Sequence, residues 1–361
     1  MCKGAMHEKI ALLVAIMLLA ILVVILTACD TDGFESAPIT WKRFFGDGCT
    51  FEVSSTTNSI DLSILCLSFD KRVEIGYHIT IGETMIIIDG KAVAQKVRND
   101  LKEEVTSLAQ EIGLAVVLVG DDNASRIYVR NKINACAEIG LKSTLVELPG
   151  TATEEEVIDA VITLNNDTAV HGIIVQLPLP KHIDTDKVLA TINSDKDVDG
   201  CHYVQKGKLW TGTPETLPCT PYGCIELLKH YNIAIEGKHA VVLGRSNLVG
   251  RPLAELLLRE NATVTMCHSK TANIADVTRS ADILCVAIGK SKYVTADMVK
   301  DGAVIIDVGI NRDDNGKLCG DVDFESVKDK CSYITPVPGG VGPMTVTMLM
   351  KNTVEAYKRN R

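Results

Sequence analysis

Short, continuously apolar runs alternate with longer amphipathic segments from residue 85 to the end of the chain. Residues 92–112 carry apolar side chains at helical spacing, which predicts an amphipathic helix. The apolar run at 115–119 has no polar break, which is typical of a strand buried on both faces of a parallel sheet. By the same criteria we expect helices at 128–139, at 250–259 and after the capping box at 153–156, and strands at 173–175, 240–243, 263–266, 283–287 and 304–307.

This alternation of strand and helix predicts the fold class. Both halves of the region from residue 85 onward are expected to be α/β, with parallel sheets and right-handed crossover connections. A chain of 361 residues is too long for one compact core. We therefore expect two domains, with an appendage at the N-terminus.

The first 84 residues differ in character from the rest. Residues 10–28 form an uncharged apolar run that is long enough to span a bilayer, that fits a signal peptide, and that ends in a sequence resembling a lipoprotein processing site. Residues 29–82 show no sustained helical or strand periodicity, so we expect only a linker there. Two interpretations remain open: a membrane anchor, or a start codon placed too far upstream. We favour the second, because the α/β pattern begins at Met85.

Composition and charge exclude several classes of function. The net charge of −9 gives the chain no electrostatic footprint for binding nucleic acid. The twelve cysteines include no CxxC pair, so we expect reduced, buried thiols and neither a zinc site nor a disulfide framework. No HExxH or P-loop motif is present, so the sequence indicates no metal site.

A glycine turn joins a predicted strand to a predicted helix at residues 241–252. Such a turn directs backbone N–H groups and the N-terminus of a helix at a pyrophosphate, which indicates a dinucleotide site. The spacing is not GxGxxG, because Ser246 stands two residues after Gly244 and Gly250 arrives one residue late. The alternative is an ordinary tight turn between strand and helix.

The end of the following strand indicates which dinucleotide binds. An Asp or Glu about 20 residues past the glycines usually binds a free ribose 2′-hydroxyl, and none is present there. The strand ends instead at His268, Ser269 and Lys270, with Arg245 available from the glycine turn. These residues suit a 2′-phosphate, so NADP is the expected cofactor, unless the polar groups merely face solvent.

Tyr128 and Lys132 lie four residues apart at the start of a predicted helix, so both project from one face. A ring beside an amine suits a flat, conjugated substrate, although such a pair alone is more often surface decoration. Four further segments change that weighting. They are VQLPLP at 175–180, KDVDG at 196–200, PCTP at 218–221 and TPVPGGVGPMT at 335–345.

Together these segments closely resemble the bifunctional methylenetetrahydrofolate dehydrogenase/methenyltetrahydrofolate cyclohydrolase family, from about residue 85 to the C-terminus. The resemblance implies a cytoplasmic, homodimeric enzyme that binds tetrahydrofolate derivatives, oxidises 5,10-methylenetetrahydrofolate with NADP and hydrolyses the product. It implies a catalytic folate-binding domain at 85–222 and 334–361, to which the C-terminal helix returns, and a Rossmann-like NADP-binding domain at 223–333. Residues 1–84 have no counterpart in this family.

The same resemblance implies roles for individual residues. Lys132 would be the catalytic lysine, Gln176 the residue that orients it, and Tyr128 the ring that stacks on the folate. Asp199 would anchor the pterin, with Asp197 as the alternative for that role. The implied NADP site comprises Gly244, Arg245, Ser246, Ser269 and Ile310, and the implied substrate site includes Pro338 and Gly339.

One departure and two other functions stay open at this point. After Gly200 the family usually continues with Phe-His-Pro, whereas this chain has Cys201, His202 and Tyr203, so domain closure or substrate affinity is expected to differ. A dehydrogenase without cyclohydrolase activity is one alternative, against which the intact Lys132 and Gln176 argue. A membrane-tethered nucleotide-binding module without catalysis is the other.

Overall fold

The computed structural model describes residues 39–45, 49–56, 59–68, 71–80 and 85–361. The chain divides into two compact units, Met1–Glu83 and Thr84–Arg361. The apolar run at 10–28, and with it the predicted anchor or signal, lies outside the described residues. Within the described ranges, no helix is both long enough and apolar enough to cross a membrane.

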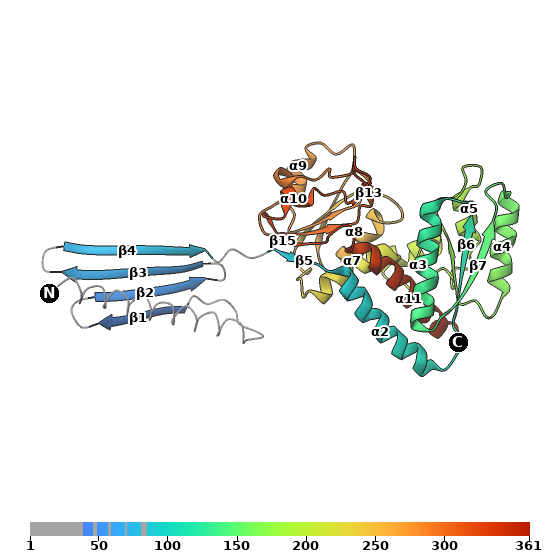
Figure 1. Ribbon diagram of the computed structural model, residues 1–361, viewed down its shortest axis with the longest axis horizontal. Helices are drawn as coiled ribbons and strands as arrows, with labels where there is room; N and C mark the ends of the chain where they lie inside the picture. The colour runs from blue at the N-terminus through green and yellow to red at the C-terminus, as the bar shows by residue number, and fades with distance from the viewer. Residues whose placement is uncertain (1–38, 46–48, 57–58, 69–70, 81–84) are drawn as a thin grey trace. The chain divides into compact units, whose positions relative to one another are not determined.

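The described part of the first unit is an antiparallel sheet of four strands in sequence order (Figure 1). The prediction of a linker without strand periodicity at 29–82 was therefore wrong. Apolar residues do alternate with polar ones near its end, at Val73, Ile75, Tyr77 and Ile79, and a period of two is the pattern of a strand. The strands are β1 (Ile39–Phe45), β2 (Cys49–Thr56), β3 (Ser59–Ser68) and β4 (Lys71–Thr80).

The second unit contains a parallel sheet of three strands in the order β7-β6-β8. Its central strand is buried throughout, as the apolar run predicts. Val116 belongs to the core on the side of α3, whereas its neighbour Val117 belongs to the core on the side of α4, and Figure 1 shows these two helices on opposite sides of the sheet. The elements are β6 (Gly113–Val119), α3 (Asn123–Ile139), β7 (Lys142–Leu148), α4 (Glu154–Asn166), β8 (Gly172–Val175) and α5 (Thr185–Thr191).

A second parallel sheet has the order β10-β9-β11-β12-β15-β5. Alternate residues of its strand β9 again enter two different cores, with Val242 in one and Val241 in the other. Its edge strand comes from the start of the unit, so residues 86–87 lie beside residues 331–334. The strands are β5 (Ile86–Ile87), β9 (His239–Leu243), β10 (Thr263–Cys267), β11 (Ile283–Val286), β12 (Ala303–Asp307) and β15 (Cys331–Ile334).

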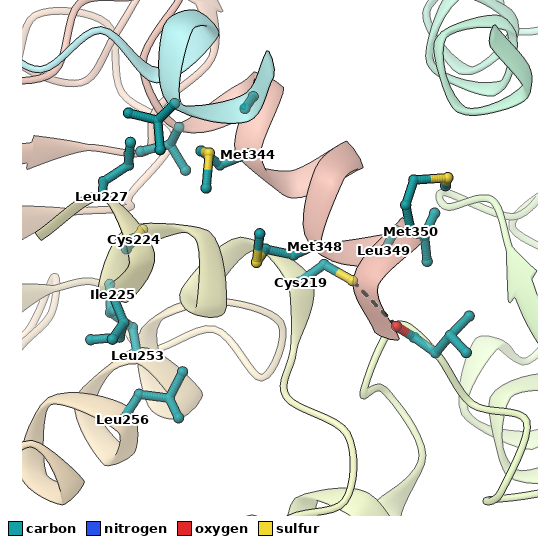
Figure 2. Close-up of a cluster of buried hydrophobic side chains, with 14 of the residues drawn as sticks. Cys219, Cys224, Ile225, Leu227, Leu253, Leu256, Met344, Met348, Leu349 and Met350 are labelled. Carbon is teal, nitrogen blue, oxygen red and sulfur yellow. Dashed lines mark hydrogen bonds between the residues drawn. The ribbon is translucent and has the colours of Figure 1, made fainter. Parts of the chain in front are cut away.

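The C-terminal helix α11 (Val341–Arg359) packs against α7 (Cys219–His230), α2 (Gly90–Leu108) and α3. Figure 2 shows Met344 and Met348 of this helix beside side chains of α7. The expected return of the C-terminal helix to the first half of the unit is confirmed. The remaining elements are α6 (Tyr203–Trp210), α8 (Gly250–Arg259), α9 (Ile274–Arg279), the 3-10 helix η1 (Ala296–Met298), β13 (Asn311–Arg312), β14 (Leu318–Cys319) and α10 (Phe324–Val327).

Two helix ends differ from the prediction, and each has a local cause. Helix α2 ends at Leu108, short of the predicted residue 112, because Ala109 takes a left-handed conformation with φ of 49°. Helix α3 begins at Asn123, five residues earlier than predicted, because the Asp122 carboxylate accepts the N–H of Ser125 and caps the helix. The boundaries of α8 and the capping box at Thr153 are as predicted.

A chain that begins at Met85 is expected to fold by itself. The cores of the second unit are built from residues 85 onward, so its free energy of unfolding, measured by thermal and denaturant unfolding, should match that of this unit in the full chain to within about 1 kcal/mol. A chain that begins at Asp89 is the control. It loses the fully buried Ile88 and the bond from its N–H to the Ile334 carbonyl, and should lose about 2 to 5 kcal/mol. Aggregation or a non-cooperative transition of the Met85 chain would contradict this expectation.

Candidate functional site

A cavity of about 200 Å³ lies beyond the carboxyl end of β8. It lies where the first half of the second unit, which contains the three-stranded sheet, meets the other half, which contains the sheet around β9. Most of its walls come from the first half and from α11. Leu248 and Val249 belong to the loop between β9 and α8 in the other half. The full lining is Lys132, Ile174, Val175, Gln176, Leu177, Asp199, Cys201, Cys219, Thr220, Leu248, Val249, Thr345 and Leu349.

Lys132 is the buried amine of this cavity, with only 8% of its surface exposed. It lies in the third turn of α3, and its Nζ donates a hydrogen bond of 2.9 Å to Oε1 of Gln176. Gln176 follows β8 and is itself fixed, because its backbone N–H bonds to the Val117 carbonyl and its Nε2 donates to the Leu177 carbonyl. Burial lowers the pKa of the Lys132 amine, and the charge of the nearby Asp199 opposes that shift.

The two candidate carboxylates have different surroundings. Asp197 is 1% exposed, and its carboxylate accepts the backbone N–H groups of Cys201 and His202. It therefore holds the turn that follows it and does not line the cavity. Asp199 is half-buried and lines the cavity with Lys132, so the structure places Asp199 and not Asp197 at the site.

Sequence reasoning missed several residues of the cavity wall. Cys201 lines it where the related family usually has phenylalanine, and its Sγ lies 3.5 Å from Oδ2 of Asp199. Cys219 donates to the Val198 carbonyl over 3.3 Å (Figure 2). Burial raises the pKa of both thiols, so both stay protonated and unreactive. The signal for them in the sequence was their place, with Cys201 directly after the KDVDG segment and Cys219 inside the PCTP segment.

Three of the residues predicted for the folate site do not line this cavity. Tyr128 is one helical turn before Lys132 and is 39% exposed. Pro338 and Gly339 lie in the loop before α11, where the Gly339 carbonyl accepts the N–H of Lys91. This loop leads into the helix that carries Thr345, so it places one wall of the cavity.

A second cavity, of about 260 Å³, lies at the carboxyl ends of β9, β10 and β11. Gly244, Arg245, Ser246 and Ser269 line it, as predicted for a nucleotide site. Gly244 has φ of 132°, and a Cβ there would lie 2.2 Å from the Ala287 carbonyl oxygen, so only glycine fits. The full lining is Leu243, Gly244, Arg245, Ser246, His268, Ser269, Ile274, Ala287, Ile288, Lys290 and Tyr293.

The irregular glycine spacing has a structural explanation. The Oγ of Ser246 accepts the backbone N–H groups of Val249 and Gly250, at 3.1 and 3.3 Å. Ser246 thus binds the backbone at the start of α8 from the position where GxGxxG loops have their second glycine. The same loop lines both cavities, through Arg245 on one side and Leu248 on the other.

The polar groups of the second cavity match a phosphate better than a ribose hydroxyl. No Asp or Glu occurs among its lining residues, whereas Arg245 and Lys290 do. Lys290 was missed from the sequence, and its Nζ lies 5.1 Å from the centre of the Tyr293 ring. Ile310 is 50% exposed on the loop after β12 and is not part of the lining.

Comparison with known proteins identifies the fold and the family. The catalytic domain of the tetrahydrofolate dehydrogenase/cyclohydrolase family matches residues 88–199, and its NAD(P)-binding domain matches residues 218–361. The curated protein "Bifunctional protein FolD" of Bacillus anthracis is 56% identical over 277 residues, which is 76% of this chain and 97% of that protein. The FolD protein of Streptococcus pneumoniae serotype 2 has the same identity and coverage.

Solved structures agree with the sequence matches. The bifunctional FolD enzyme of Campylobacter jejuni has 50% identity and a TM-score of 0.75, covering 77% of this chain and all of that one. The Trypanosoma brucei enzyme, solved with NADP and an inhibitor, has 42% identity and a TM-score of 0.73, covering 76% of this chain and 98% of that one. The chain described here therefore belongs to the tetrahydrofolate dehydrogenase/cyclohydrolase family.

Proposed function

We propose that the cavity around Lys132 is the single site at which this enzyme carries out both of its reactions. The chain is a bifunctional NADP-dependent enzyme, which oxidises 5,10-methylenetetrahydrofolate to the 5,10-methenyl form and hydrolyses that product to 10-formyltetrahydrofolate. The observation that carries the proposal is the buried bond between Lys132 and Gln176, opposite the loop that also lines the nucleotide cavity. This assembled pair disfavours both a monofunctional dehydrogenase and a non-catalytic binding module.

For the oxidation, the chain's task is to bring the two substrates together. The methylene carbon of the folate loses a hydride. Bound NADP would supply the acceptor for that hydride, at C4 of its nicotinamide. Leu248 and Val249 provide apolar surface from the nucleotide loop inside the folate cavity, so the loop that is proposed to hold the dinucleotide lies against the folate site. Gly244, Arg245, Ser246 and Ser269 are proposed to hold the dinucleotide, with Ile310 flanking it from the loop after β12.

For the hydrolysis, Lys132 is proposed to act as the general base. The methenyl carbon is cationic, and a C–O bond forms as water adds to it. A neutral Lys132 amine takes one proton from that water, which leaves a hydroxyl on the carbon. The hydroxyl then loses its proton to solvent as the C–N5 bond breaks and N5 takes the proton from the Lys132 ammonium, which leaves the formyl group on N10 and restores the neutral amine. Burial favours this role, because the lowered pKa increases the fraction of neutral amine near neutral pH.

The remaining side chains are proposed to bind and orient the folate. An ionised Asp199 accepts two N–H bonds from the aminopyrimidinone edge of the pterin. Tyr128 stacks on the folate from the mouth of the cavity, and Pro338 and Gly339 shape its rim. We further propose, from the family resemblance, that the enzyme is cytoplasmic and that it is a homodimer. Light scattering on the purified protein would test the homodimer.

Replacing Lys132 with Met is expected to abolish the hydrolysis without unfolding the protein. Met keeps the aliphatic volume and removes only the amine, so hydrolysis of methenyltetrahydrofolate, followed by its near-ultraviolet absorbance, should fall by about 100-fold or more. Lys142→Met is the matched control, because Lys142 is exposed and paired with Glu111. Hydrolysis at the unaltered rate in the Lys132→Met enzyme would refute the assignment.

Arg245→Ala is expected to weaken NADP binding selectively. A hydrogen bond to a charged group contributes ~1.5 to 3 kcal/mol, so the KM for NADP should rise by about 10- to 150-fold while the KM for NAD changes little. The variant Ser269→Asp should reverse the preference, because a carboxylate repels the 2′-phosphate and accepts bonds from a free ribose. If the unaltered enzyme had the higher kcat/KM with NAD, this interpretation of the strand end would be wrong.

A further inference from the structure

Asp321 is fully buried, and its carboxylate accepts four hydrogen bonds, none of which comes from a basic side chain of the described residues. Its Oδ2 accepts the backbone N–H groups of Ile288 and Gly289, at 2.7 and 2.9 Å. Its Oδ1 accepts the backbone N–H of Lys290 and the side-chain amide of Asn311, both at 2.8 Å. Four such bonds compensate for the loss of water around a buried charge.

The donors belong to two loops at the carboxyl edge of the second sheet. Residues 288–290 follow β11, and Ile288 and Lys290 line the nucleotide cavity. Asn311 follows Ile310 of the loop after β12 and is the first residue of β13. A single carboxylate therefore fixes the position of both loops, although Asp321 itself is not part of the cavity lining.

Asp321 is in turn held in place by a second buried acid. The Asp307 carboxylate accepts the backbone N–H groups of Asp321 and Val322, both at 3.0 Å, and that of Gly309 at 2.9 Å. A Cβ on Gly309 would lie 2.4 Å from Cγ of Asp321, so the two segments are in direct contact. The carboxylate of Asp321 consequently has one position, which its surroundings determine.

The residue that precedes the 288–290 loop touches the glycine turn. Ala287, the residue before this loop, presents its carbonyl to Gly244 so closely that no side chain fits between them. If residues 288–290 moved, Ala287 would move with them and shift the backbone that is proposed to hold the pyrophosphate.

We propose that Asp321 is a positioning residue for NADP, which acts through the loops at 288–290 and 309–311 without touching the cofactor. This proposal rests on the assignment of the second cavity to NADP.

Asp321→Asn is the most direct variant, because it keeps the size of the side chain. Whichever way the new amide turns, two N–H donors face its NH₂ group in place of an acceptor. The KM for NADP, and the Kd measured by calorimetry without folate, should rise by about 10- to 100-fold. Hydrolysis of methenyltetrahydrofolate added directly, which consumes no NADP, should be unchanged.

The hydrolysis reports whether the effect is local. If Asp321→Asn left the Kd for NADP unchanged, or lowered hydrolysis in parallel with NADP binding, the proposal would be wrong. Asp323→Asn is the matched control in the same segment, because the Asp323 side chain does not cap the helix that follows it, and it should leave both activities unchanged.

Two further variants keep the outcomes separable. Asn311→Ala removes only the bond from the Asn311 side chain to Asp321, so it tests the proposal even if Asp321→Asn does not fold. Its Kd for NADP should rise by about 3- to 10-fold, and an unchanged Kd would overturn the proposal. Arg245→Ala tests the cavity itself: if this variant also binds NADP normally, the assignment of the cavity fails, whereas a loss confined to Arg245→Ala rejects only the role of Asp321.

Discussion

A lysine amine held away from water is the constraint on which the rest of the site depends. Lys132 lies in a helix whose start is fixed by Asp122, and its Nζ reaches an amide oxygen fixed by the end of β8. Because the amine is buried, its neutral form is favoured, and a neutral amine can take a proton from water. The walls of its cavity come from both halves of the unit, so the hydrolysis proposed for Lys132 requires both halves.

The glycine turn between β9 and α8 lies between the two cavities and contributes to both. One part of it lines the nucleotide cavity and another part lines the folate cavity. Its geometry depends on contacts of backbone and short side chains. Gly244 lies against Ala287, and the Ser246 hydroxyl accepts the N–H groups of Val249 and Gly250 at the start of α8. Because this turn packs closely against its neighbours, its backbone can hold a cofactor next to a substrate without the help of long side chains.

The sequence was sufficient for most of this fold, and physical reasons explain where it was not. The buried strands β6, β9 and β12 were predictable because a parallel sheet covered on both faces needs continuous apolar runs. Strand β7 is exposed along much of its length, so no such run marks it. The strands of the first unit alternate polar and apolar residues weakly, and that pattern was overlooked.

The candidate site was predictable for the side chains that are proposed to carry the chemistry and not for those that hold the backbone. Lys132 and Gln176 could be located from motifs, and the structure brings them together. The choice between Asp197 and Asp199 needed coordinates, because it depends on which carboxylate already accepts hydrogen bonds from backbone N–H groups. Asp321 left no signal at all, since bonds to the backbone do not depend on the identity of the residues that donate them.

The central claim is that the folded protein holds Lys132 partly neutral, and direct titration of that amine tests it. The protein would be enriched with isotope-labelled lysine, and the Lys132 signal would be assigned by its absence from the Lys132→Met protein. NMR spectra recorded across a pH series would then give the pKa of the amine. The account predicts a pKa below the ordinary value for lysine. A pKa at or above that value would contradict it, because the amine would then be charged when water has to be deprotonated.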